Sequence, residues 1–195
     1  MMQVRVSGKT ITLVQGDITH QDVDAIVNAA NKTLLGGGGV DGAIHRAAGP
    51  ELLQECKRIR QEVLGGAYVE TAQPVMTGGY RLKARHVIHV VGPICRIDPH
   101  PDRLLRLAYW NSLQLAANAG LQSVAFPSIS TGAFGCDVRW ASGIALSTIV
   151  DFLNQSSKQE LSATDRLNEV RMVLFTRADY DVYAETLREL IKGTN

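Results

Sequence analysis

The chain has 195 residues, with 20 Lys and Arg against 19 Asp and Glu, so its formal net charge is +1. This length predicts one globular domain, residues 1–195, with room for a hydrophobic core. The near-neutral charge makes nucleic acid an unexpected partner. No apolar run approaches the ~20 residues that cross a bilayer, and the N-terminus lacks the apolar stretch of a secretory signal. We therefore expect a cytoplasmic protein that does not bind membranes.

The predicted elements alternate between strands and helices. The order begins with a β-hairpin, whose strands at 4–7 and 11–15 flank a turn at 8–10, and continues with a strand at 25–27, a glycine-rich loop at 28–39 and helices at 42–48 and 51–62. The remainder is predicted as strands at 70–75 and 86–91, a helix at 102–119, a strand at 123–126, a helix at 138–153, an exposed loop at 156–168, a strand at 170–175 and a helix at 180–191. Continuous apolar strands separated by helices predict an α/β fold of three layers around a mixed sheet.

Three cysteines, Cys56, Cys95 and Cys136, are widely spaced and form no C-x-x-C pair. Their odd number and spacing fit neither a disulfide framework nor a zinc site. We expect three reduced thiols and no metal.

Two glycine-rich loops each follow a buried strand and precede a helix. The loops are residues 36–42, which include Gly37, Gly38, Gly39 and Val40, and residues 130–135, which include Ser130, Thr131, Gly132, Ala133 and Phe134. Backbone N–H groups in such loops approach anions closely, beside the positive end of the following helix. Because ligands in α/β sheets lie beyond the carboxyl ends of the strands, the two loops predict a diphosphate site. A flexible surface turn is the alternative for the first loop. Phe134 either stacks on a sugar or fills the base of its loop.

Two nucleotide-binding motifs fit the sequence poorly. The P-loop pattern would end at Thr10, but Gln3 stands where its first glycine belongs. Gly37, Gly39 and Gly42 satisfy G-x-G-x-x-G, yet that motif requires a tight turn directly after the strand, and eight residues intervene here. We therefore reject an NTPase and disfavour a dehydrogenase.

Polar side chains near the first loop could contact a ribose. Asn28 and Asn31 offer donors and acceptors to hydroxyl groups, and Asp41 could orient or deprotonate water. The asparagines could instead shape the loop, and Asp41 stands where a helix N-cap is expected. Asp17 could cap a short helix or accept a hydrogen bond from an adenine amino group. His45 lies four residues after Asp41 on the same predicted helix and could reach it.

Five motifs in order resemble a macrodomain of the MacroD type. They are residues 14–19 (VQGDIT), 23–31 (VDAIVNAAN), 36–46 (GGGGVDGAIHR), 87–93 (VIHVVGP) and 125–135 (AFPSISTGAFG). The resemblance runs from about residue 3 to residue 190. It implies an α/β/α sandwich around a mixed sheet that binds ADP-ribose and requires neither metal nor cofactor.

The resemblance also implies roles for individual residues. Asp17 and Ile18 match the adenine site, residues 37–40 and 130–134 match the two diphosphate loops, and Asn28 matches the distal-ribose site. Asn31 and Asp41 match the pair assigned to catalysis. The implied activity is hydrolysis of ADP-ribosyl esters, on O-acetyl-ADP-ribose and on proteins mono-ADP-ribosylated at acidic side chains. The alternatives are a non-catalytic ADP-ribose reader and a phosphatase acting on a terminal phosphate ester.

The sequence departs from the family pattern at two points. Cys136 and Asp137 stand where Tyr-Pro is common, which puts the rigidity of the loop exit in question. Residues 64–70 (LGGAYVE) replace the usual Cys-x-Thr-Gly-x-Ala pattern, so the approach to the site is also expected to differ.

Overall fold

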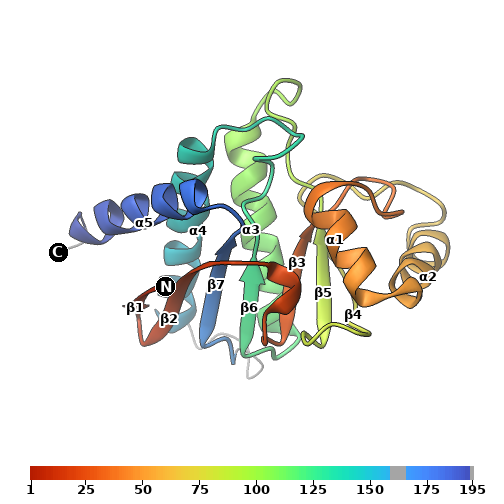
Figure 1. The fold of residues 1–195 in the computed structure, drawn as a ribbon, viewed down its shortest axis with the longest axis horizontal. Coiled ribbons are helices and arrows are strands. Elements are labelled where there is room, and N and C mark those ends of the chain that lie inside the picture. Colours follow the sequence, from red (N-terminus) through yellow and green to blue (C-terminus); the bar gives the residue numbers. More distant parts are fainter. Residues whose placement is uncertain (159–165, 194–195) are drawn as a thin grey trace.

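The computed structural model describes residues 1–158 and 166–193 (Figure 1). The strands are β1 (Met2–Val6), β2 (Lys9–Gln15), β3 (Ala25–Ala29), β4 (Val75–Gly78), β5 (His86–Val90), β6 (Ser123–Phe126) and β7 (Glu169–Leu174). The helices are α1 (Gly39–Ala48), α2 (Pro50–Arg58), α3 (Pro101–Asn118), α4 (Val138–Lys158) and α5 (Arg177–Lys192), with a 3-10 turn at Ile18–His20 and a π-helical turn at Ile59–Val63.

The seven strands form one mixed sheet in the order β1-β2-β7-β6-β3-β5-β4. Neighbours from β2 to β5 in this order are parallel, and the two edge strands β1 and β4 pair antiparallel with β2 and β5. The carboxyl ends of the five parallel strands therefore meet at one edge of the sheet, where ligands of α/β proteins bind.

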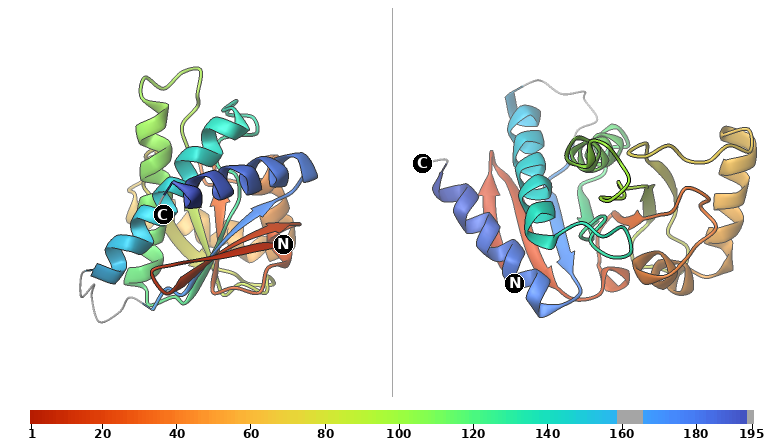
Figure 2. Two further views of the ribbon diagram at one scale, coloured as in Figure 1. Left: turned by 90° about the vertical axis from the view of Figure 1, so that its left-hand side faces the viewer. Right: turned by 90° about the horizontal axis from the view of Figure 1, so that it is seen from above.

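Helices cover both faces of the sheet, as Figure 2 shows from above. Successive strand residues point to opposite faces, so Val27 packs with α3, α4 and α5 in one core, whereas Ile26 packs with α1 and α2 in another. The predicted three-layer α/β/α fold is confirmed.

Helix α3 follows its sequence signals closely. Pro101 occupies the first turn, where its missing N–H costs nothing, and Leu105, Leu113 and Ala116 are fully buried. Gly120 follows the end of the helix with a φ of 69°, the left-handed conformation that glycine tolerates.

Several predicted boundaries are wrong; the last helix, α5, begins at Arg177 rather than at residue 180. The strand expected at 70–75 is β4 at Val75–Gly78, because Gln73 N–H bonds to Glu70 C=O in a turn and Ala72 has a φ of 64°. Helix α1 begins at Gly39 rather than at residue 42. Helix α4 continues to Lys158, so the predicted loop at 156–168 begins as helix, and residues 159–165 lie outside the described part.

Within residues 1–158 and 166–193, the helices lack the combination of length and apolar character that crossing a membrane requires.

Candidate functional site

Two adjoining cavities open at the carboxyl edge of the parallel strands. One has a volume of about 510 Å³ and is bounded by the ends of β2, β6 and β7; the other has about 410 Å³ and lies beyond β3 and β5. Gly39, Val40, Ser128 and Gly132 line both cavities, so the two form a continuous cleft.

The cleft brings together all but one of the site residues predicted from the sequence. The larger cavity is lined by Asp17, Ile18, Gly39, Val40, Thr131 and Gly132. The smaller cavity is lined by Asn31, Gly37, Gly38, Gly39, Val40, Asp41, Ser130, Gly132, Ala133 and Phe134. Asn28 lines neither cavity because it is buried on β3, behind Asp41.

The first glycine loop leads directly into α1. The N-cap is Gly38, which has no side chain that could bond to the N–H groups of the first turn. These groups and the helix dipole favour an anion at this point. The prediction that Asp41 caps the helix is wrong, because α1 starts two residues earlier and Asp41 is its third residue.

Close packing fixes this loop against α1. A Cβ atom on Gly42 would come within 3.0 Å of the carbonyl oxygen of Gly37. A Cβ atom on Gly37 would in turn lie 3.2 Å from Asn31 Nδ2 and 3.2 Å from Asp41 Oδ2. The two polar side chains therefore approach the same point beside the loop.

Asp41 is a buried carboxylate, 5% exposed. Its Oδ1 accepts a hydrogen bond from Asn28 Nδ2 at 2.7 Å and lies 3.5 Å from His45 Nε2, as the helical spacing predicted. Its buried Oδ2 has no hydrogen-bond partner in the part of the chain that the structure describes. Burial raises the pKa of Asp41. The hydrogen bond from Asn28 and the proximity of His45 lower it, but by less, so the net effect is a raised pKa. An unpartnered carboxylate oxygen with a raised pKa is suited to accepting a proton from water.

Asn31 shapes the loop. Its Nδ2 donates to Gly36 C=O at 2.8 Å, and its Oδ1 accepts from Thr33 N–H and from the Thr33 hydroxyl. The loop-shaping interpretation is therefore confirmed, and Asn31 also lines the smaller cavity.

Asp17 caps the 3-10 turn that follows β2. Its Oδ1 accepts from both the N–H and the hydroxyl of Thr19, at 2.8 and 2.7 Å. Burial alone would raise the pKa of Asp17, but these bonds outweigh it and lower the pKa. Because both bonds end on Oδ1, Oδ2 remains able to accept from a ligand in the larger cavity.

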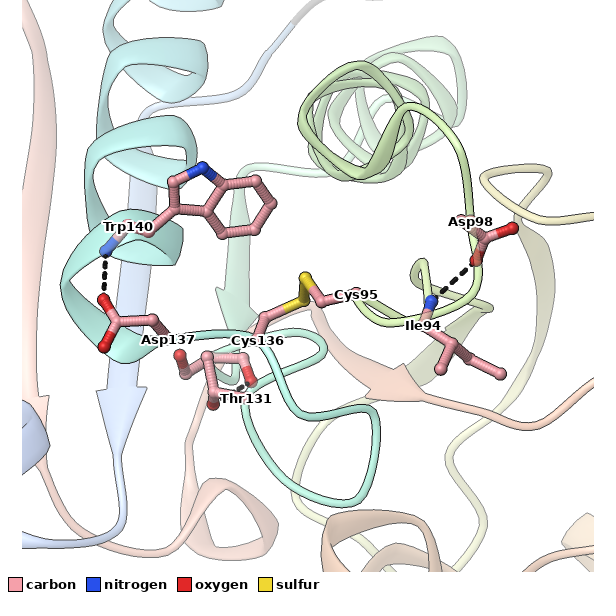
Figure 3. Close-up of a disulfide and its surroundings, with 8 residues drawn as sticks. Ile94, Cys95, Asp98, Thr131, Cys136, Asp137 and Trp140 are labelled. Carbon is pink, nitrogen blue, oxygen red and sulfur yellow. Dashed lines mark hydrogen bonds between the residues drawn. A yellow bond between two sulfur atoms is a disulfide. The ribbon is translucent and has the colours of Figure 1, made fainter.

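The second glycine loop is held by its own backbone and by a disulfide. Ser130 has a φ of 68°, and Cys136 N–H bonds to Ser130 C=O. Cys95 N–H bonds to Phe134 C=O, and Cys95 and Cys136 form a disulfide, which Figure 3 shows at the exit of the loop. The prediction of three reduced thiols is wrong for this pair, whose Cα atoms lie 5.2 Å apart although the residues are 41 positions apart in the sequence. Cys56 is free and buried.

Phe134 fills the base of its loop, which was one of the two alternatives, whereas its stacking on a sugar stays a prediction. It packs against the core beneath α1 and α2, and it lines the smaller cavity. The hydroxyl of Ser130 is buried against Gly92, so closely that a Cβ atom on Gly92 would overlap it. Among the described residues this hydroxyl has no hydrogen-bond partner.

Sequence reasoning missed several cleft residues. Arg46 lines the larger cavity, although neither glycine loop contains a cation. Gly39, Ala43 and Arg46 recur at helical spacing on one face of α1, so periodicity counted from Gly39 would have found it. Phe175, 78% exposed, lines the same cavity after β7. In the described ranges, no group of three His, Cys, Asp or Glu side chains could hold a metal ion.

Comparison with known proteins gives consistent matches. The family model described as Macro domain matches residues 27–145. The chain is 50% identical over 151 residues to the O-acetyl-ADP-ribose deacetylase of Escherichia fergusonii, which covers 77% of this chain and 84% of that protein. It is 44% identical over 181 residues to the ADP-ribose glycohydrolase MACROD2 of Xenopus laevis, which covers 92% of this chain and 40% of that protein. A solved structure of an Oceanobacillus iheyensis macrodomain with ADP matches with a TM-score of 0.92 at 43% identity, over 98% of this chain and 97% of that one.

Proposed function

We infer the function of this chain from one premise: it belongs to the Macro domain family. We propose that this hydrolase, folded as a single macrodomain over residues 1–195, binds ADP-ribose and hydrolyses ADP-ribosyl esters. Its substrates would be O-acetyl-ADP-ribose and proteins mono-ADP-ribosylated on acidic side chains. The relatives named as a deacetylase and as a glycohydrolase support this assignment.

The ligand would occupy the continuous cleft from end to end. Asp17 and Ile18 would contact the adenine in the larger cavity, and residues 37–40 and 130–134 would bind the diphosphate through backbone N–H groups. The distal ribose would then lie in the smaller cavity beside Asn31 and Asp41. Arg46, on the rim of the larger cavity, adds a positive charge that favours the diphosphate.

One observation carries the proposed reaction: the buried Asp41 lines the smaller cavity, and its Oδ2 has no hydrogen-bond partner among the described residues. A water held between this oxygen and a phosphate oxygen of the ligand would attack the ester. The proton would pass to Asp41 or to the phosphate, the ester bond would break, and no covalent enzyme intermediate would form. Holding the water and the ester together supplies most of the acceleration.

The experiment compares the wild type with Asp41→Asn, without added metal. This variant retains an acceptor for Asn28 and removes only the charge and the basicity. Release of ADP-ribose from a glutamate-modified protein and loss of acetate from O-acetyl-ADP-ribose are measured, with calorimetric titration of ADP-ribose. We expect a wild type that turns over both substrates and a variant that binds ADP-ribose but is at least 100-fold slower, since general base catalysis contributes ~10²–10⁴-fold.

A wild type that binds ADP-ribose but releases nothing would make the protein a reader instead. Release of inorganic phosphate from ADP-ribose carrying a terminal phosphate ester, without ester hydrolysis, would make it a phosphatase.

A further inference from the structure

A second histidine lies behind the proposed reaction site. His89 is fully buried in β5, and the sheet register pairs it with Asn28 of β3. Its Nδ1 lies 3.1 Å from Asn28 Nδ2, and its Nε2 lies 2.9 Å from Thr77 Oγ1 and 3.9 Å from Cys56 Sγ. The histidine therefore joins β3, β4, β5 and α2 beneath Asp41.

The chemistry of these partners fixes the direction of each hydrogen bond. The amide nitrogen of Asn28 has hydrogens and no accepting lone pair, so Nδ1 of His89 must accept. The imidazole is neutral, because burial, assisted by the charge of His45, lowers the pKa of His89 to about 3. Its one proton is then on Nε2, which donates to Thr77 Oγ1, and the Thr77 hydroxyl donates to Gly78 C=O at 3.1 Å.

The opposite orientation of Asn28 is incompatible with an ionised Asp41. Turning the amide would place Asn28 Oδ1 at the 2.7 Å position now held by Nδ2, against Asp41 Oδ1, so two acceptors would face each other. In the observed orientation both N–H groups of Asn28 have acceptors, and its buried Oδ1 has no partner within residues 1–158 and 166–193. The amide is thus oriented by one acceptor on each side.

We propose that His89 is a positioning residue for the hydrolysis: by accepting from Asn28 it directs the second N–H of that amide to Asp41 Oδ1 and leaves Oδ2 for the reacting water. This inference rests on the proposed function. His89 does not touch the cavity and acts only through Asn28.

If His89 positions Asn28 in this way, removing His89 should raise the pKa of Asp41. Three groups that titrate face this part of the site: His45 on α1, Cys56 on α2 and His89 on β5. The hydrogen bond from Asn28 favours the ionised form of Asp41, against burial. Without the acceptor on His89, Asn28 can turn away, so the pKa of Asp41 rises further and a smaller fraction is ionised at neutral pH.

The test uses three variants of the full chain. His89→Leu removes the acceptor, and His89→Asn places an amide oxygen near the position of Nδ1 and should restore part of the effect. His86→Leu is the matched control, because it makes the same change on the same strand, three residues away and on the opposite face.

We expect His89→Leu to lower kcat about tenfold with KM changed less than twofold. We also expect it to shift the acidic limb of the pH–rate profile up by about one unit, a tenfold change in the acid dissociation constant. His89→Asn should recover most of both effects, and His86→Leu should stay within twofold of the wild type. A loss equal in His89→Leu and His89→Asn, or a kcat loss with no shift of the pH profile, would overturn the proposal.

Two NMR measurements do not depend on turnover. In the wild type, the ring nitrogens of ¹⁵N-labelled His89 should show a protonated Nε2 and a bare Nδ1 from pH 5 to pH 8. Carboxyl ¹³C titration should give a higher pKa for Asp41 in His89→Leu than in the wild type. If His89→Leu fails to fold, the proposal is tested by the tautomer of His89 in the wild type and by the carboxyl titration of Asp41 in His89→Asn. A proton on Nδ1 of His89 would refute the proposed hydrogen bond from Asn28. A wild type inactive on esters but showing both NMR results would overturn the proposed function and leave the positioning of Asp41 by His89 standing.

Discussion

Replacing Gly42 with alanine tests whether the contact between α1 and the first glycine loop holds the proposed diphosphate site in place. The new Cβ atom would lie less than 3.0 Å from the carbonyl oxygen of Gly37 and 3.4 Å from its carbonyl carbon. The contact is with backbone, so the loop or the helix must shift by at least a few tenths of an ångström. Overpacking of this kind costs about 1–3 kcal/mol.

Gly143→Ala is the matched control. Gly143 lies within α4, and a Cβ atom there would meet nothing within 4 Å. Both substitutions gain about 1 kcal/mol of helix propensity, so the difference between the two variants isolates the clash. We expect Gly143→Ala to raise the free energy of unfolding by about 1 kcal/mol, and Gly42→Ala to fall about 1–3 kcal/mol below it.

Binding should weaken for the same reason. If the variant relieves the clash by moving Gly37, the ligand must restore the loop, at a cost of up to the same 1–3 kcal/mol, or about 5- to 150-fold in Kd. Denaturant unfolding and calorimetric titration with ADP-ribose measure the two effects. The reasoning is refuted if Gly42→Ala matches Gly143→Ala in stability and binds ADP-ribose as tightly as the wild type.

Two further predictions concern charge and covalent structure. The folded-state pKa of Asp41 is raised above the value of 3.8 that is ordinary for this group in an unfolded chain. The stability that Asp41 contributes is therefore present below pH 3.8 and is lost as pH rises through the folded-state pKa. Asp41→Asn should therefore gain stability relative to the wild type between pH 4 and pH 7 in parallel thermal melts, and a constant difference would contradict this. Reducing the Cys95–Cys136 disulfide should cost about 4 kcal/mol in the chain-entropy model for a 41-residue separation, measured by urea unfolding with and without a dithiol. Thiol counting in denaturant without reductant should find Cys56 alone, and three titrating thiols would show that the disulfide is absent.

Local sequence signals predicted the elements that need no distant partner. The hairpin between β1 and β2 follows from a turn in which Ser7 and Gly8 both have positive φ. The cap formed by Asp17 and the start of α3 at Pro101 likewise depend on residues within one turn. Asp41 was misjudged as a cap because its short polar side chain fits that position equally well, and the true start of α1 depends on the packing of Gly42 against Gly37.

The fold class, the two glycine loops and the candidate residues could be predicted from the chain alone, because they are encoded in periodicity, spacing and motif order. How those parts meet could be read only from the folded molecule. The order of the parallel strands places His89 beside Asn28, and the return of the chain after α3 brings Cys136 to Cys95. Such contacts join residues 41 and 61 positions apart. Local propensity does not encode them, because they form only when burial of both faces of the sheet selects which strands are neighbours.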